Sequence, residues 1–372
     1  MADIKTHLRE LSVAVGIGIK KNRDLPNNLA LTKPKDFFNL AYLIVNNDIS
    51  SARNILEIPV FTPEHHQIIK NGLKLADIIV KIFNVGPSDR IIWLGSDTQK
   101  NDPIDLIVGN IGFSLKEESY ILENMGLYKY LNLMTGSSFS RGLHVFEYFS
   151  PQEYNNWFQY TWNRLLNIPG GYWETNNGRY HSSIHVTDNK VTLNYNNTDI
   201  KILPTSPITI ADFQQSTNSV VREKVFSKWI NETLRTDTAY LSVKNQCSIV
   251  AGENLCRYVI DNLNPMNLAR LLQIYEIEYY YAKSTSNELK ILKVPRRDDF
   301  SNEIEVANVE YSVPSSQLNI LTTIRNKQTG RYLTIRNECR FSHGQFNGTP
   351  EAKMYYEHGN DLSVIYTPIY EK

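Results

Sequence analysis

The chain has 372 residues, 41% hydrophobic and 21% charged, and this ordinary globular composition excludes a disordered protein. Lys plus Arg and Asp plus Glu both total 39, so the formal net charge is zero and a polybasic nucleic-acid binder is excluded. No run of about 18 apolar residues is present, and the N-terminus has no apolar signal core. The chain has three cysteines, Cys247, Cys256 and Cys339, which cannot build a disulfide framework. We therefore expect a cytoplasmic protein without a membrane segment.

The N-terminal part of the chain is expected to be mainly helical over residues 1–60. A further helix is expected to begin at Thr62, which is a favourable N-cap followed by Pro63 at the first helical position and Glu64 in the first turn. Apolar residues at helical spacing continue this pattern to Phe83.

Three short apolar runs then have the length and composition of β-strands: residues 90–94, 104–108 and 112–116. A glycine-containing connection from Gly109 to Gly112 is typical of a hairpin between the last two. Downstream, the same patterns predict helices over 117–133, 151–167, 212–234 and 252–278, strands within 170–205, and a hairpin of 319–325 with 331–339.

These elements predict an α/β protein with a mixed central sheet flanked by helices. The pattern of predicted helices and strands changes near residue 210, so we expect two regions, residues 1–210 and residues 211–372. The second region is expected to be helical at first and rich in β-strands after Arg297.

The predicted hairpin contains three polar residues that could form a catalytic site. Asp105 stands between Ile104 and Leu106, so in a strand it projects opposite to two apolar side chains. Ser114 and Lys116 share one face of the next strand, and pairing of the two strands brings them to Asp105. A carboxylate that holds Mg²⁺, next to a lysine, suits hydrolysis of a phosphodiester. The lysine would orient or help deprotonate the attacking water, or stabilise the developing charge.

These residues resemble the PD-(D/E)XK nuclease superfamily and, within it, the type II restriction endonucleases. Asp105 matches the aspartate of the family motif and Lys116 matches its lysine, and the resemblance covers roughly residues 60–135. It implies a restriction-endonuclease-like core, catalytic roles for Asp105, Ser114 and Lys116, and Mg²⁺ as the cofactor.

The sequence departs from the family pattern at two positions. Ile104 stands where the family often has proline, and Ser114 stands where it usually has a second carboxylate. Glu118 continues the same strand face and could supply the missing metal ligand beside Asp105. Glu64 is the other candidate, since such nucleases often take an acid from a helix that precedes the sheet. The competing interpretation is an ordinary edge hairpin with a solvated aspartate and lysine.

Residues 336–353 combine two glycines with side chains that recognise base edges, and they follow a predicted β-hairpin. We expect DNA contacts from Arg336, Arg340, His343, Gln345, Asn347 and Lys353. The alternative for this segment is a polar loop that packs the C-terminal strands, with Arg340 paired to Glu338 or Glu351.

The sequence as a whole therefore predicts a Mg²⁺-dependent endonuclease that cleaves double-stranded DNA at specific sites. Such an enzyme usually acts as a symmetric homodimer that matches a palindromic site. The alternatives are a nuclease of DNA repair or phage DNA processing, and a DNA-binding protein without catalytic activity.

Overall fold

The computed structural model describes residues 4–22, 31–46, 55, 57–95, 103–116, 121–139, 145–196, 198–340, 346, 351–357 and 361–372. The chain folds into two compact units. The first contains Met1–Ser119, Gln273–Glu303 and Asp361–Lys372, and the second contains Tyr120–Leu272 and Ile304–Asn360. The boundary expected near residue 210 lies inside the second unit, so each unit is assembled from segments far apart in the sequence.

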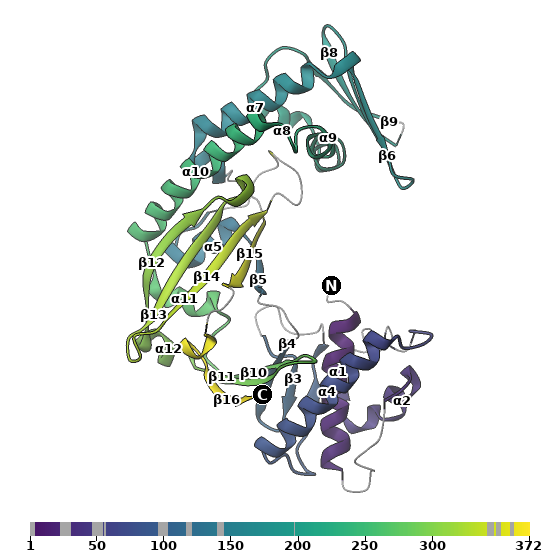
Figure 1. Ribbon diagram of the computed structural model, residues 1–372, viewed down its shortest axis with the longest axis vertical. Coiled ribbons are helices and arrows are strands. Elements are labelled where there is room, and N and C mark those ends of the chain that lie inside the picture. Colours follow the sequence, from purple (N-terminus) through teal and green to yellow (C-terminus); the bar gives the residue numbers. More distant parts are fainter. Residues whose placement is uncertain are drawn as a thin grey trace. The chain divides into compact units, whose positions relative to one another are not determined.

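The first unit is built on a mixed seven-stranded sheet (Figure 1). Its strands, in spatial order, are β1 (Val45–Asn46), β2 (Ile91–Trp93), β3 (Leu106–Val108), β4 (Ile111–Lys116), β10 (Tyr279–Ser284), β11 (Leu289–Val294) and β16 (Thr367–Glu371). Strands β2, β3 and β4 pair in antiparallel fashion, whereas β10 pairs with β4 in parallel. The expectation of a mixed α/β fold with a mixed sheet flanked by helices is confirmed.

Two long helices, α1 (Ile4–Lys21) and α4 (Pro63–Ile82), pack against each other and contribute to the core of this sheet. Thr62 caps α4 as expected, and its hydroxyl accepts a hydrogen bond from the amide of His65. A side chain at Gly72 would meet Ser12 of α1 at 2.7 Å, so this glycine permits the close approach of the helices. As a result α1 is buried from His7 to Ile19.

The remaining helices of the first unit are short: α2 (Pro34–Asn39), a 3₁₀ turn at Ala41–Leu43, α12 (Arg297–Glu303) and a 3₁₀ turn at Leu362–Val364.

The second unit contains two antiparallel sheets. One has five strands in the order β12 (Ile304–Ser312), β13 (Asn319–Asn326), β14 (Tyr332–Arg340), β15 (Glu351–Tyr356) and β5 (Ile121–Gly126). The other has four strands, β6 (Tyr172–Asn176), β7 (His181–Val186), β8 (Lys190–Tyr195) and β9 (Thr198–Pro204).

Helices accompany both sheets of this unit. The longer ones are α5 (Leu127–Thr135), α7 (Pro151–Leu166) and α10 (Thr238–Asp261). The shorter ones are α6 (Val145–Phe149), α8 (Ile210–Ser216), a π-helical turn at Val221–Phe226, α9 (Ser227–Thr233) and α11 (Pro265–Leu271), with 3₁₀ turns at Pro169–Gly171 and Pro314–Ser316.

Local patterns located most of these elements, and three predictions were wrong. The helix expected over 212–234 is interrupted after α8, which ends at Ser216, and the chain continues as the π-helical turn and α9. The helix expected over 117–133 is preceded by strand β5, because residues 121–126 pair with β15 more than 200 positions later in the chain. The helix expected over 252–278 begins earlier, at Thr238 behind the N-cap Asp237, and ends at Asp261. Pairing between distant strands and helix capping therefore outweighed local periodicity.

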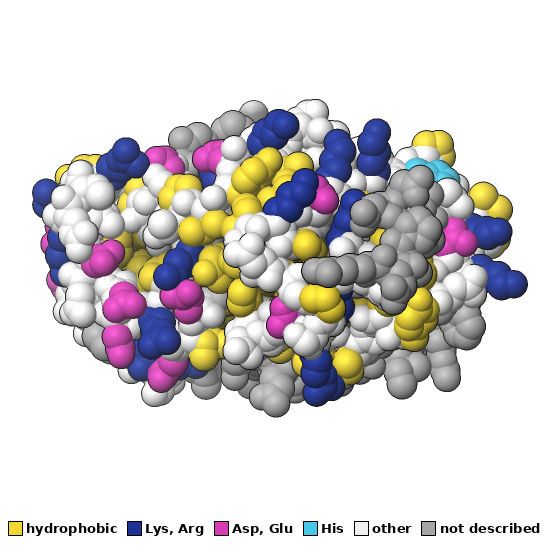
Figure 2. Space-filling view, turned by 90° about the horizontal axis from the view of Figure 1, so that it is seen from below, with side chains coloured by type: hydrophobic (Ala, Val, Ile, Leu, Met, Phe, Trp, Pro, Cys, Tyr) yellow, Lys and Arg dark blue, Asp and Glu magenta, His cyan; other side chains and the backbone are white. Residues whose placement is uncertain are grey.

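Within the described part of the chain, no helix is both long and apolar enough to span a bilayer. Figure 2 shows basic and acidic side chains interspersed over the face that it displays. This distribution agrees with the zero net charge of the sequence.

Candidate functional site

Asp105 is held firmly at the start of β3. Its amide donates a hydrogen bond to the carbonyl of Phe113 at 2.9 Å, and its carbonyl accepts one from the amide of Leu94 at 3.0 Å. The carboxylate Oδ2 accepts a hydrogen bond from the amide of Leu115 at 2.7 Å and lies 3.8 Å from Lys116 Nζ. The flanking Ile104 and Leu106 are buried, so the expected alternation of side chains is present.

Ser114 lies beside this carboxylate and is 1% exposed. Its hydroxyl forms a hydrogen bond with Asp105 that favours the ionised carboxylate. The structure therefore brings together the three residues that the hairpin pattern singled out: Asp105, Ser114 and Lys116.

A second carboxylate comes from helix α1. Glu10 is 4% exposed, and its Oε2 accepts a hydrogen bond of 3.0 Å from Trp93 Nε1 of β2. Burial and, to a lesser extent, the charge of Asp105 raise the pKa of Glu10 to about 8, while Trp93, Lys116 and Arg9 oppose the shift. Glu10 thus belongs to the same electrostatic cluster as Asp105 and Lys116.

Burial also raises the pKa of Asp105 above its ordinary value. Lys116 is the strongest opposing influence, followed by hydrogen bonds from the Leu115 amide and from Ser114. Two desolvated carboxylates that share one environment cannot both carry charge cheaply unless a cation lies between or beside them. Two described cations oppose the negative charge of Asp105 and Glu10. They are the ammonium group of Lys116, 3.8 Å from Asp105, and the guanidinium group of Arg9.

The donor set of this cluster fits Mg²⁺. Carboxylate oxygens are hard ligands, and Mg²⁺ commonly takes one or two of them and completes its shell with water and substrate phosphate. Among the residues that the structure describes, no group of three or more His, Cys, Asp or Glu side chains is placed to hold a metal. Glu10 and Asp105 are the two carboxylates of this cluster that could serve as ligands of such an ion.

The two sequence-based candidates for the second ligand have different outcomes. Glu64 lies in the first turn of α4, where its side chain is 62% exposed and its Oε1 pairs with Lys5 Nζ at 2.6 Å. Among the described residues, the structure shows this ion pair and no contact of Glu64 with Asp105, whereas Glu10 lies in the electrostatic cluster of Asp105. Glu118 lies outside the described residues.

Glu10 had no usable signal in the sequence. It lies more than 90 positions before Asp105, in a helix whose burial depends on packing against α4 and β2. The one available hint was an acid within a segment that is otherwise rich in apolar residues from Leu8 to Ile19.

The residues expected to contact DNA lie in the second unit, and three of them are described. Arg336 pairs with Glu357 at 3.1 Å and lies over the ring of Tyr355. Arg340 Nη2 donates hydrogen bonds to Glu338 Oε2 at 2.8 Å and to the Tyr355 hydroxyl at 3.0 Å. Lys353 lies opposite Glu338 in the pairing of β14 with β15. His343, Gln345 and Asn347 lie outside the described residues.

The described residues of this segment have features of both interpretations, DNA contact and strand packing. Residues directly opposite each other on paired strands share a face of the sheet, so Arg336, Glu338, Lys353 and Tyr355 lie on one face. All four are partly exposed. The pairing of Arg340 with Glu338, which the packing alternative requires, is present.

Comparisons of the chain with protein-family models, with curated proteins and with solved structures gave no match.

Proposed function

We propose that this protein is a Mg²⁺-dependent endonuclease that hydrolyses phosphodiester bonds of double-stranded DNA at specific sites. The observation that carries the proposal is the convergence of three residues: Glu10 of α1, Asp105 directly before β3, and Lys116 of β4. The resemblance of Asp105 and Lys116 to the type II restriction endonucleases supports it. That family often takes a further acid from a helix before the sheet, and Glu10 occupies such a position.

Each residue of the cluster has a definite task in this proposal. Bound Mg²⁺ would neutralise charge on the scissile phosphate and lower the pKa of a water molecule. Asp105 and Glu10 hold the ion, and the hydrogen bonds from Leu115 and Trp93 fix the two carboxylates in place. Lys116 presents its ammonium group to the charge that develops on the phosphate.

The second unit would supply recognition. Arg336, Arg340 and Lys353, together with His343, Gln345 and Asn347, are proposed to contact the bases and backbone of DNA. A symmetric homodimer would place two such surfaces on a palindromic site.

A plasmid assay tests the proposed activity. Purified protein should convert supercoiled plasmid to linear DNA in the presence of Mg²⁺ and leave it intact in the presence of a chelator. Retention of plasmid on the protein without cleavage at any Mg²⁺ concentration would instead support a DNA-binding protein.

The stability of the Glu10→Gln variant should depend less on pH than the stability of the wild type does. The folded-state pKa of Glu10, about 8, exceeds its ordinary value of 4.5, so the folded state binds this proton more tightly than the unfolded state does. The stability that this group contributes is therefore complete at low pH and is lost as the pH rises from about 4.5 through about 8. The amide of the variant cannot ionise, and it keeps an oxygen acceptor for Trp93.

We expect the melting temperature of the metal-free wild type to fall relative to Glu10→Gln by a few degrees across that pH range. Mg²⁺ should then stabilise the wild type at alkaline pH and leave the variant unchanged. Equal responses of both proteins to pH and to Mg²⁺ would remove Glu10 from the metal site.

Ser114→Ala should be a mild variant. The serine hydroxyl is a weaker ligand for a hard cation than a carboxylate, and its described role is a hydrogen bond that lowers the pKa of Asp105. Loss of one hydrogen bond to a charged group costs roughly 1.5–3 kcal/mol, so cleavage should slow by roughly 10- to 150-fold, less than for Asp105→Asn. The loss should shrink as the pH is raised. A loss as large as that of an Asp105 variant would show that Ser114 has a different role.

Arg340→Ala should relax the choice of DNA sequence. Removal of a base-edge contact costs about 1–3 kcal/mol, so the ratio of cognate to non-cognate affinity should fall roughly 5- to 150-fold. The Mg²⁺ requirement should not change. Arg325→Ala is the matched control, because Arg325 forms a comparable ion pair with Glu305 on neighbouring strands. If Arg340→Ala lowers only thermal stability and leaves the affinity ratio intact, the segment packs strands and does not read bases.

A further inference from the structure

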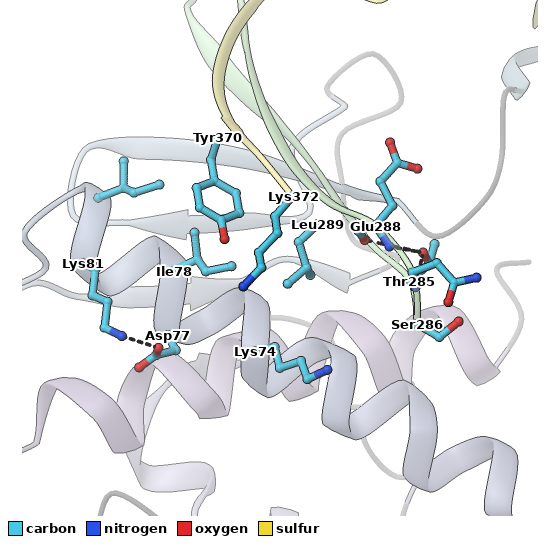
Figure 3. A pocket seen from close by; sticks show the side chains of 12 residues that line it. Lys74, Asp77, Ile78, Lys81, Thr285, Ser286, Glu288, Leu289, Tyr370 and Lys372 are labelled. Atoms are coloured by element: carbon cyan, nitrogen blue, oxygen red, sulfur yellow. Dashed lines mark hydrogen bonds and ion pairs between the residues drawn. The ribbon is translucent and has the colours of Figure 1, made fainter. Parts of the chain in front are cut away.

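A cavity of about 510 Å³ lies in the first unit between α4 and the turn that joins β10 to β11 (Figure 3). Its apolar lining consists of Ile78 and Ile82 of α4, Leu289 of β11 and the ring of Tyr370 of β16. Volumes of roughly 300–1,000 Å³ with a partly apolar lining are typical of small-molecule sites. Glu10, Asp105 and Lys116 do not line it, so it is separate from the proposed nuclease site.

The charges around this cavity favour an anion. Three lysines line it: Lys74, Lys81 and Lys372. The carboxylate of Asp77 is already neutralised, because it lies 2.7 Å from Lys81 and 3.6 Å from Lys20. The hydrogen bond from Lys81 accordingly lowers the pKa of Asp77.

The other acid of the lining, Glu288, is directed elsewhere. Its carboxylate pairs with Lys283 at 2.6 Å, and Figure 3 shows that it points away from α4. Lys74 and Lys372 also line the cavity, and Figure 3 draws no ion pair from either of them to the other residues that it shows. Of the charged side chains that line the cavity, three are basic and two are acidic.

The turn between β10 and β11 adds hydrogen-bonding groups at the rim. Thr285 Oγ1 accepts hydrogen bonds from the amides of Asn287 at 3.2 Å and Glu288 at 3.0 Å, which fixes the turn. Ser286 and Asn287 are exposed beside it and line the cavity. Their hydroxyl and amide groups can donate and accept hydrogen bonds to a polar ring or a sugar.

We propose that this cavity binds a nucleoside monophosphate. Lysines recognise the phosphate, the ring of Tyr370 and the side chain of Leu289 offer an apolar surface to the planar base, and the turn offers hydrogen bonds to its edge or to the sugar. The three features occur together in one cavity of suitable size. The ligand is a free nucleotide, and the site does not depend on the proposed nuclease activity.

The proposal is tested by calorimetric titration of adenosine monophosphate into the metal-free protein of 372 residues at fixed ionic strength. Adenosine and inorganic phosphate are titrated separately, which measures the affinity of the protein for the nucleoside part and for the phosphate part of the ligand. The nucleotide should bind at least ten-fold more tightly than either half. Lys74→Glu should weaken binding at least ten-fold. Lys70→Glu is the matched control, since Lys70 is exposed one turn earlier on α4 and does not line the cavity, and it should bind within about two-fold of wild type.

Asp105→Asn should bind the nucleotide as wild type does, which distinguishes this cavity from the proposed nuclease site. Absence of nucleotide binding, or equal binding by Lys74→Glu and Lys70→Glu, would overturn the proposal. Phosphate that binds as tightly as the nucleotide would overturn the assignment of the base. None of these results depends on whether the protein cleaves DNA.

Discussion

Asp105→Asn is expected to slow Mg²⁺-dependent DNA cleavage by at least about a thousand-fold, which corresponds to about 4 kcal/mol of activation free energy. Asparagine retains an oxygen that can accept the hydrogen bond from the Leu115 amide, so the hairpin should keep its fold. It lacks the negative charge that holds the cation. Single-turnover cleavage rates at saturating protein measure the effect.

Glu64→Gln is the matched control for this experiment. Glu64 was the ligand suggested by its position at a helix start, and the structure pairs it with Lys5 instead. Its neutral variant should cleave within about two-fold of wild type. A folded Asp105→Asn protein with nearly full activity would remove Asp105 from the site, whereas a thousand-fold loss in Glu64→Gln would restore Glu64 as a ligand.

Lys116→Ala should lower the cleavage rate by roughly a hundred- to a thousand-fold, about 3–4 kcal/mol, because it removes a positive group that stabilises charge on the phosphate. Affinity for cognate DNA should be nearly unchanged. The ammonium of Lys116 also lowers the pKa of both Asp105 and Glu10. Its removal should therefore raise both pKa values and move the rising limb of the pH–rate profile to higher pH.

The pH profile distinguishes a role in the site from a general loss of stability. A variant that is merely less stable should lose activity in proportion at every pH, with the limb unchanged. Full cleavage by a folded Lys116→Ala protein would contradict the assignment of the lysine.

The sequence predicted those residues of the candidate site that lie in one hairpin, because strand alternation and the turn can be recognised locally. Alternation around Asp105 and the glycine-containing turn located β3 and β4, and strand pairing then placed Ser114 and Lys116 beside the carboxylate. Helix α4 was predicted for the same reason, since its N-cap and apolar spacing are contiguous in the chain. Local chemistry is sufficient wherever the interacting residues are neighbours in sequence or joined by a short hairpin.

The rest of the site depends on distant contacts. Glu10 reaches the site because α1 is buried against α4 and β2, and the hydrogen bond with Trp93 spans 83 positions. Strand β10 pairs with β4 from more than 150 positions away in the sequence. A boundary placed near residue 210 from the local pattern of elements therefore could not reveal which segments form the first unit. For Arg336, residue type indicated DNA contact, and only the structure identifies its partner Glu357. For Arg340, the sequence left Glu338 and Glu351 as possible partners, and the structure shows the pair with Glu338.

The most direct test of the account is digestion of a long DNA of known sequence by the wild-type protein, with Mg²⁺ and with a chelator, beside Asp105→Asn. We expect discrete fragments from the wild type with Mg²⁺ alone, whose ends map to one short symmetric sequence, and intact DNA in the other reactions. Fragments of random length, cleavage in the presence of the chelator, or equal cleavage by Asp105→Asn would contradict a site-specific nuclease built on Asp105, Glu10 and Lys116.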